Sequence, residues 1–416
     1  MKKVYRIALF VFLVLALLVG GGLIWFQNLE LSPVAGMTVE DSEARIDPAA
    51  LQDLLASARQ SDTAALVVMK DGQLVGAWQR GGWLRKLETM SATKSIVNLA
   101  VGRLITLRKI ESVDVPVAQF FEEWSDGPKS QVTLRHLLSH TSGLQAKRTA
   151  LDIYEQRDFV RYALEAELES EPGAKYFYNN KACNLLAGIV GKAAGKPLDE
   201  FLREDLFAEL GIVDFKWKKD GAGNPHGMSG LVLLPTDLAT IGQFVLDRGV
   251  YEGKQLIDDS WFDLCLQSGM DSEWGCGLLW WISRERTAYI VDDDKIAELR
   301  EAGVPPEFVE RYEACRGRYE TQDDMVDVWK QNLGPDAVSQ INATLGPLNL
   351  LACRMEWGAL QHWNANGWLG QWLVIYPEEK IVGVRMSEYP LFGNPEANPN
   401  IEFSAFPEKL KALFPE

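Results

Sequence analysis

The 416-residue sequence has few of the side chains that metal or redox chemistry needs. It has only four histidines and no H-E-x-x-H segment, C-x-x-C pair or phosphate-binding glycine loop. We therefore expect no metal and no cofactor. An odd number of cysteines cannot all pair within one chain, which excludes a complete disulfide framework. A single pair such as Cys315 with Cys353 stays open, beside isolated buried thiols. The five cysteines are Cys183, Cys265, Cys276, Cys315 and Cys353.

Positive charge is scarce as well. Lys and Arg number 42 against 58 Asp and Glu, so the net charge is −16. Proteins that bind nucleic acid neutralise phosphates with a basic face, and this composition offers no such surplus. We therefore expect no nucleic-acid partner. The apolar fraction of 47% is enough to bury a sizeable core, in one large domain or two ordinary ones.

A long uncharged run lies at the N-terminus. Lys2, Lys3 and Arg6 precede residues 7–26, and about 20 helical residues span roughly 30 Å, the thickness of a bilayer core. The run is long for a cleaved signal peptide, so an uncleaved anchor is favoured. The pattern predicts a cytoplasmic tail at 1–6, a transmembrane anchor at 7–26 and a linker at 27–48. The basic flank then predicts a single-pass inner (plasma) membrane protein, with residues 49–416 on the periplasmic or extracytoplasmic side.

Strand patterns stand at both ends of the remaining chain. Alternating apolar runs flank Asp71-Gly72, a strong hairpin signal, and a second hairpin is predicted around residues 377–380. Between about 91 and 265 the apolar spacing is mainly helical, and residues 285–352 are charged and irregular and indicate an insertion. The sequence therefore predicts one α+β domain, whose antiparallel sheet is closed by its own termini, flanked by helices and interrupted by a helical subdomain.

The segment "SATK" opens one predicted helix with Ser91 and Lys94. Residues three apart share a helix face, and the positive end of a helix favours an alkoxide. A lysine accepts a proton only when it is neutral, a form that desolvation favours, so this pair is typical of an activated nucleophile and its base. Because S-x-x-K arises by chance in a chain this long, a helix start with a solvated lysine is the ordinary alternative.

Two further segments bear on this choice. Tyr178-Asn179-Asn180 is the only Y-x-N in the chain; a tyrosine beside a lysine can pass a proton, and an asparagine offers a donor and an acceptor. A core tyrosine and an asparagine helix cap are the alternative. The segment "VTLRHLLSHTSGL" contains His136 and His140, for which we expect structural roles, because the chain lacks the G-x-S-x-G elbow of Ser–His–Asp hydrolases.

Taken in order, these segments resemble the serine β-lactamase-related family. This family includes class C β-lactamases, penicillin-binding-protein-like D-alanyl-D-alanine carboxypeptidases, esterases and 6-aminohexanoate-dimer hydrolases. "MSATKSI" resembles its S-x-x-K helix start, "VTLRHLLSHTSGL" its most recognisable loop, and "YFYNNKACNLLAGIV" its Y-x-N segment. The glycine loop and helix at 227–257 and the last strands at 365–386 match as well. The resemblance covers roughly residues 50 to 410, apart from the insertion.

The resemblance implies a β-lactamase/transpeptidase-like fold and a serine hydrolase that cleaves an ester or amide, in a small molecule or peptide, through an acyl-enzyme. It makes Ser91 the acylated nucleophile, Lys94 its proton acceptor or relay, and Tyr178 the group that exchanges a proton with the leaving group. Asn180 would hold Lys94 or a substrate amide. The oxyanion hole would be the backbone N–H of Ser91 and that of Trp368, which follows Gly367.

The third motif departs from the family pattern. The family often has Lys or His, then Thr or Ser, then Gly, and here the triplet is Ala365-Asn366-Gly367. An alanine cannot recognise the carboxylate of a β-lactam or peptide terminus, and the A-x-G-x-x-G-Q form through Gln371 resembles the dimer-hydrolase and esterase branches. A D-Ala-D-Ala peptidase or β-lactamase is the alternative within this chemistry, and a non-catalytic envelope binding protein is the alternative outside it.

Tryptophans gather around this motif. An aromatic wall over the acyl site is one interpretation, and ordinary core packing is the other. They are Trp357, Trp363, Trp368 and Trp372. For His362, nearby, we expect a structural or surface role.

Overall fold

The structure is a computed structural model that describes residues 46–81, 85–147, 149–267, 275–348, 350–388 and 403–415. Its main element is an antiparallel sheet of seven strands in the order β2-β1-β12-β11-β10-β8-β9. These strands are β1 (Thr63–Lys70), β2 (Gln73–Gln79), β8 (Trp281–Val291), β9 (Gly317–Tyr319), β10 (Arg354–Gly367), β11 (Gln371–Tyr376) and β12 (Ile381–Ser387). A small sheet has the order β3-β5-β4, and β6 pairs with β7. These are β3 (Leu87–Glu88), β4 (Lys216–Trp217), β5 (Leu231–Leu233), β6 (Val250–Tyr251) and β7 (Lys254–Gln255).

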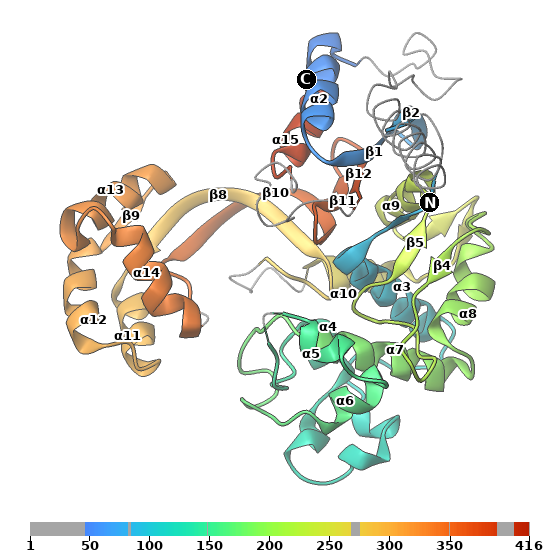
Figure 1. Cartoon of the computed structure of the whole chain (residues 1–416), viewed down its shortest axis with the longest axis horizontal. Coiled ribbons are helices and arrows are strands. Elements are labelled where there is room, and N and C mark those ends of the chain that lie inside the picture. Colours follow the sequence, from blue (N-terminus) through green and yellow to red (C-terminus); the bar gives the residue numbers. More distant parts are fainter. Residues whose placement is uncertain are drawn as a thin grey trace, which may run out of the picture.

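Helices fill the chain between the strands (Figure 1). Those of the main region are α2 (Pro48–Gln60), α3 (Thr93–Thr106), α4 (Leu134–Leu138), α5 (Leu151–Tyr154), α6 (Phe159–Glu165), α7 (Asn180–Ala194), α8 (Leu198–Leu202), α9 (Pro235–Leu246), α10 (Asp259–Gln267) and α15 (Phe406–Lys411). Those of the insertion are α11 (Asp293–Glu301), α12 (Pro306–Tyr312), α13 (Gln322–Leu333) and α14 (Ala337–Leu345). The predicted α+β architecture, an antiparallel sheet with helices, is confirmed.

Both predicted hairpins form. Asp71 and Gly72 join β1 to β2 with positive φ angles of 51° and 78°, the geometry that a two-residue turn between twisted strands requires. The second hairpin joins β11 to β12, with Tyr376 opposite Ile381. Because β1 also pairs antiparallel with β12, the first and last strands of the domain lie side by side, second and third from one edge of the sheet.

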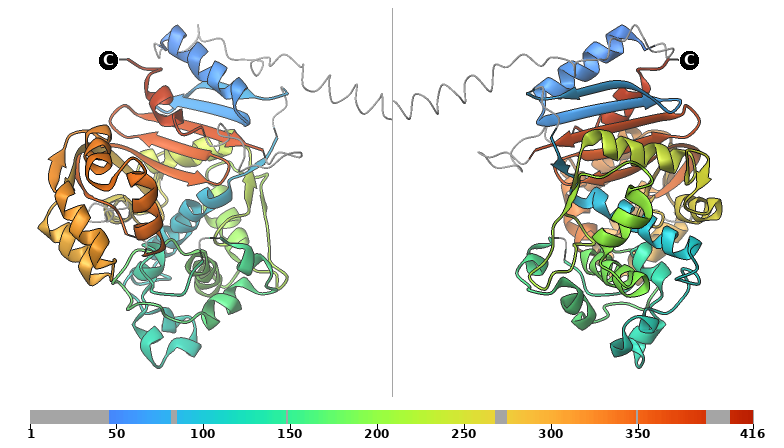
Figure 2. Two further views of the ribbon diagram at one scale, coloured as in Figure 1. Left: turned by 60° about the vertical axis from the view of Figure 1, so that its left-hand side comes forward. Right: turned by 90° about the vertical axis from the view of Figure 1, so that its right-hand side faces the viewer.

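The sheet is covered on both faces (Figure 2). Successive residues of a strand point to opposite faces, and along β1 Leu66 and Val68 pack into a cluster with α2 and α15, while Val67 joins the larger core on the other side. Helix α9 packs on that second face so closely that a Cβ on Gly242 would lie 2.6 Å from side chains of β11 and β12. The larger core then continues through α3 into the helical region.

Helix α3 is central to that core. Its residues from Thr93 to Gly102 are all buried, which is the pattern of a helix surrounded by protein on every side. Its polar positions are matched individually: Ser95 donates to the carbonyl of Leu279 (2.6 Å) and Asn98 donates to that of Leu278 (2.7 Å). These bonds hold α3 against the segment that leads into β8, and so fix the helix relative to the sheet.

The insertion is a folded subdomain. Strands β8 and β10 extend beyond the rest of the sheet as a long two-stranded arm, and α11 to α14 with β9 stand at its far end (Figure 1). These elements bury an apolar cluster of their own, including Phe308, Tyr312 and Trp329. All five cysteines are buried thiols, and Cys315 and Cys353 belong to this cluster without a disulfide between them.

The predicted single-pass membrane location is corrected here. Among the described residues no helix is long and apolar enough to cross a bilayer. The longest of them, α7, has 15 residues and so spans only about 22 Å, against roughly 30 Å for the hydrocarbon core. A membrane anchor is therefore not supported. The tail at 1–6, the anchor at 7–26 and most of the linker at 27–48 lie outside the described residues.

Candidate active site

Ser91 and Lys94 meet at the start of the central helix. Ser91 lies in a single 3₁₀ turn, Met90–Ala92, and Lys94 is the second residue of α3. The Lys94 ammonium nitrogen lies 3.1 Å from Ser91 Oγ, within hydrogen-bond distance. Ser91 is half-buried, whereas Lys94 is only 3% exposed, so the lysine meets the hydroxyl from the protein side. The predicted spacing thus brings the two groups together.

The backbone around Ser91 is held in an unusual conformation. Met90 has a φ of 48°, in the left-handed region that a side chain rarely adopts. Gly367, at the end of β10, packs directly on this turn: a Cβ there would lie 2.5 Å from the carbonyl oxygen of Thr89 and 2.9 Å from the amide nitrogen of Ser91. Only a glycine allows this approach. Strain of this kind is often found at functional sites, where surrounding structure maintains it.

The Lys94 ammonium has a second hydrogen-bond partner, a backbone carbonyl. It donates to the carbonyl of Met228 at 2.7 Å. The loop that carries Met228 is itself pressed onto α7, because Gly227 donates its N–H to the Asn184 side chain (2.9 Å) and a Cβ at 227 would lie 1.9 Å from the carbonyl of Cys183. The glycine loop between β4 and β5 therefore holds the Met228 carbonyl in position to accept from the lysine.

Tyr178 completes the group from the segment before α7. The Lys94 ammonium lies 4.8 Å from the centre of the Tyr178 ring, over its face. On another side, the ring stacks on Trp281 at a centroid distance of 6.4 Å and an interplanar angle of 15°. A cation over an aromatic face is a favourable contact. Tyr178, Lys94 and Ser91 therefore form one connected cluster from two separate parts of the chain.

His140 holds Tyr178 in place. Its carbonyl accepts from the N–H of Phe177 (2.8 Å) and its ring Nδ1 accepts from the N–H of Asn179 (3.2 Å), so both neighbours of Tyr178 are bound to one residue. The two rings also touch, with centroids 4.7 Å apart. Burial, with a smaller contribution from the charge of Lys94, lowers the pKa of His140 to about 3. The imidazole is therefore neutral at pH 7, which leaves Nδ1 free to accept.

A narrow recess of about 10 Å³ lies between these groups, barely the size of one water molecule. Beside the cluster just described, its wall includes Asn366 of β10, whose side chain donates to that of Asn364 (3.2 Å). Burial raises the pKa of the Cys276 thiol, which also lines the recess, to about 12, so this thiol is inert. Its lining residues are Ser91, Lys94, Ser95, His140, Tyr178, Cys276, Leu279, Trp281 and Asn366.

Comparison with known proteins identifies this arrangement. The family model described as Beta-lactamase matches residues 49–402, which is most of the chain. The chain belongs to the Beta-lactamase family. The resemblance drawn from the S-x-x-K, Y-x-N and third-motif segments is confirmed, and at the level of family so is the expectation of a serine hydrolase.

Curated relatives within this family have different activities. The chain is 34% identical over 144 residues to esterase EstB of Burkholderia gladioli, and this aligned stretch covers 30% of this chain and 36% of the esterase. It is 25% identical over 269 residues to 6-aminohexanoate-dimer hydrolase of Paenarthrobacter ureafaciens, covering 58% of this chain and 68% of that one. The chain thus spans about a third of the first relative and about two thirds of the second.

Solved structures show the same fold. A penicillin-binding-protein homologue from Caulobacter crescentus superposes with a TM-score of 0.53 at 14% identity, over 82% of this chain and 91% of the other. At that identity the similarity speaks for the fold alone.

Other residues predicted from the family pattern lie less close to the cluster. Asn180 is the first residue of α7, half-buried, and is not among the described residues that line the recess. Its neighbour Asn179 is the helix cap: it accepts from the N–H of Ala182 (3.0 Å) and donates to the carbonyl of Leu144 (2.8 Å). The asparagine helix cap that the sequence suggested is thus Asn179. That Asn180 contacts the substrate or Lys94 stays a prediction.

The four tryptophans do not form one wall. Trp363 is buried in the main core, Trp372 packs with the cluster under α2, and Trp357 contacts Arg286 on the arm. Trp368 is different, because it is 49% exposed in the turn directly after Gly367. His362 is buried, and burial lowers its pKa to about 4.

Sequence reasoning missed several residues of the recess. His140 was assigned to the loop that it does fix, but its contact with the flanks of Tyr178 was not foreseen. Trp281 and Asn366 were not singled out, although Asn366 stands in the third motif whose first residue, Ala365, drew attention. Ala365 is fully buried in the main core, and Asn366 is the neighbour that faces the recess. Strand alternation could have predicted this, because neighbouring residues on a strand face opposite sides and only one of Ala365 and Asn366 can face the recess.

Proposed function

We propose that this protein hydrolyses an ester or an amide through an acyl-enzyme formed on Ser91. The observation that supports this most is the 3.1 Å approach of the buried Lys94 ammonium to Ser91 Oγ. In a neutral state, the lysine is placed to take the serine proton as Oγ bonds to the substrate carbonyl carbon. An acyl-enzyme splits one difficult step into two easier ones, and no metal or cofactor is needed.

Tyr178 is the group proposed to give a proton to the leaving group. The bond between the carbonyl carbon and the leaving oxygen or nitrogen breaks, the Tyr178 hydroxyl protonates that atom, and Lys94 returns the serine proton to Tyr178. Water then attacks the acyl carbon, the bond between that carbon and Ser91 Oγ breaks, and the proton of the water passes through Tyr178 and Lys94 to Oγ. His140 is a positioning residue in this scheme, because it fixes the backbone on both sides of Tyr178.

The oxyanion hole is proposed at the backbone N–H groups of Ser91 and Trp368. The tight packing of Gly367 against residues 89–91 supports this, because it brings the turn after β10 to the Ser91 amide. Removing one such donor in other enzymes costs a few kcal/mol of transition-state stabilisation. The strained φ of Met90 would orient the Ser91 N–H toward the same point.

The substrate we propose lacks a carboxylate next to the scissile bond. In the recess the only cationic side chain is Lys94, and the third motif presents the neutral amide of Asn366. A carboxylate there would find no second positive charge among the described lining residues. This favours a neutral ester or amide at the acyl centre over a β-lactam or a peptide terminus.

Labelling with a fluorescent fluorophosphonate, followed by mass spectrometry, tests the proposal. We expect the label on Ser91 in the wild type and none in folded Ser91→Ala. A folded wild type that resists the label would favour a non-catalytic binding protein. A parallel reaction with fluorescent penicillin separates the substrates: stable labelling of Ser91 by penicillin would support the peptidase alternative, and hydrolysis of the penicillin that needs Ser91 would support the β-lactamase alternative.

A further inference from the structure

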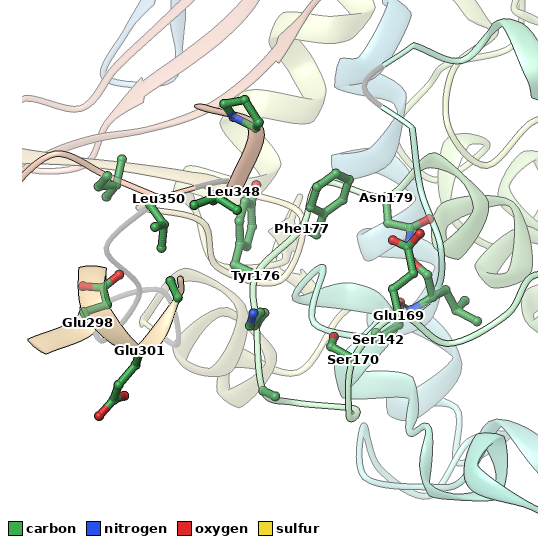
Figure 3. Close-up of a pocket in the computed structure, with 17 residues that line it drawn as sticks. Ser142, Glu169, Ser170, Tyr176, Phe177, Asn179, Glu298, Glu301, Leu348 and Leu350 are labelled. Atoms are coloured by element: carbon green, nitrogen blue, oxygen red, sulfur yellow. Dashed lines mark hydrogen bonds between the residues drawn. The ribbon is translucent and has the colours of Figure 1, made fainter. Parts of the chain in front are cut away.

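A large cavity lies between the inserted subdomain and the segment that carries Tyr178. Its volume is about 680 Å³, within the usual range for small-molecule sites and far larger than the recess at Ser91. One wall comes from α11 and from Pro347, Leu348, Leu350 and Leu351 of the insertion, and the other comes from the main region (Figure 3). Neither wall alone encloses it, so the cavity exists because the insertion stands where it does.

The cavity begins where the recess ends. Tyr178 lines the recess, while the residues on either side of it, Phe177 and Asn179, line the large cavity. Consecutive Cα atoms are 3.8 Å apart, so the two spaces share one thin stretch of chain. In the proposed mechanism Tyr178 protonates the leaving group. The half of the substrate that departs is therefore the half that would extend toward the cavity.

The walls combine apolar surface with negative charge. Tyr176, Phe177 and Leu348 stand at the centre, with Glu298 and Glu301 on one side and Glu169 on the other (Figure 3). Leu348 is 42% exposed, although it is a large apolar side chain. Such a surface is stabilised when an apolar group covers it.

Negative charge outnumbers positive charge among the lining residues, although Lys181, outside the lining, interacts electrostatically with Glu169. Three carboxylates face one ammonium, that of Lys175, among the lining residues. Glu298 is paired at 2.6 Å with the buried Lys295. Glu169 and Glu301 form no ion pair in the described part of the chain. Charges of one sign on the walls of a cavity attract the opposite charge, and low-dielectric walls strengthen the field.

We propose that this cavity binds the leaving-group half of the substrate, and that this half carries a positive charge on an apolar stem, as in an alkylammonium alcohol or amine. The inference rests on the proposed role of Tyr178. The stem covers Leu348 and the aromatic rings, and the cation lies near Glu169 or Glu301. The acyl half of the substrate is neutral and lies at the recess. The neutral half and the cationic half of the substrate therefore bind in separate spaces.

Two esters of equal shape test this. The 4-(trimethylammonio)butyl ester of butanoic acid and its neutral carbon isostere, the 5,5-dimethylhexyl ester, differ only in charge. We expect the wild type to show about tenfold higher kcat/KM for the cationic ester at low ionic strength, and a smaller ratio in 1 M salt because exposed charges are screened. The double variant Glu169→Gln/Glu301→Gln should bring the ratio to within about twofold.

The matched control is Glu310→Gln, which removes the same charge from an exposed position of α12 outside the cavity. It should keep the tenfold ratio. Equal kcat/KM for the two esters in the wild type would overturn the inference, as would a preference that survives in the double variant. Cleavage of the neutral ester that disappears in Ser91→Ala supports the proposed hydrolase activity whatever the ratio, so the two ideas fail separately.

Direct binding needs no turnover. Calorimetry with hexyltrimethylammonium should show binding to the wild type and to Glu310→Gln, and weaker binding to the double variant. If the wild type does not bind this cation, the inference is wrong even when both esters are cleaved. If it binds equally well to the double variant, the carboxylates are not the recognition element and the inference is again wrong.

Discussion

Lys94 of the main region and Lys295 of the inserted subdomain are both buried, and the two ammonium groups have different partners. Lys295 is fully buried, and its ammonium pairs with the carboxylate of Glu298. Lys94 is 3% exposed, and its partners are the hydroxyl of Ser91, a backbone carbonyl and the face of an aromatic ring. A buried ammonium without a carboxylate is costly, so it persists where chemistry needs it. The comparison separates a lysine that stabilises from one that is positioned to react.

Replacing each lysine by methionine gives the largest expected difference. Lys94→Met removes the proposed proton acceptor, and we expect kcat/KM for p-nitrophenyl butanoate to fall by about a thousandfold or more. Lys295→Met should leave the rate within about twofold of the wild type. Steady-state rates together with thermal unfolding curves test both. A folded Lys94→Met variant that keeps a tenth of the activity would show that the two lysines are alike after all.

Two glycines provide a second comparison between the main region and the inserted subdomain. A Cβ on Gly367 would meet the backbone of residues 89–91, whereas one on Gly346 in the subdomain would have nothing within 4 Å. We expect Gly367→Ala to lower kcat by about ten- to a hundredfold, because the turn that carries Ser91 must shift away from the oxyanion donors. Gly346→Ala should change kcat little. Comparable losses in the two variants would contradict the close packing seen here.

As the pH falls, the main region should lose stability before the inserted subdomain does. The pKa of His140 is lowered to about 3 and that of His362 to about 4, while residues 285–352 contain no histidine. Unfolding lets both groups take up protons below about pH 6.5, so each contributes stability above that pH that is lost as the pH falls toward its folded pKa. For His140 the loss is about 1.4 kcal/mol per pH unit at most.

Hydrogen exchange at pH 7 and pH 5 measures this loss of stability in each region separately. Amides of α3 and the segment before α7 should lose more protection at pH 5 than amides of α12 and α13. The variant His140→Asn is the control, because it removes the titrating group and should flatten the dependence of the unfolding free energy on pH. Equal loss of protection in both regions would mean that histidine burial does not govern the acid response.

Local patterns predicted some of this structure well. The turn at Asp71-Gly72 and the strand alternation around it depend on nearest neighbours, and they formed as expected. The spacing of Ser91 and Lys94 is likewise set by one turn of chain. The helices of the insertion were missed, although Asp292 and Thr321 cap α11 and α13 through their side chains. Their high charge concealed the apolar face.

Contacts between distant segments could not be predicted from local sequence patterns. That His140 binds the backbone on both sides of Tyr178 depends on how two loops cross, and His140 and Asn179 are 39 residues apart in the chain. The wide cavity depends on where a two-stranded arm carries its subdomain. No periodicity in the sequence encodes either, because each is a consequence of packing rather than of local conformation.

The pairing of β1 with β12 also governs the order in which the domain can form. Arg385 on β12 donates to Thr63 on β1 across 322 residues of chain, at 2.9 Å. At about 5–20 residues per second, a ribosome needs roughly 15 to 60 s to make that stretch. During this time the hairpin of β1 and β2 has an open edge where β12 will pair. The nascent protein therefore passes through a long interval in which its first strands must be kept from pairing with other chains.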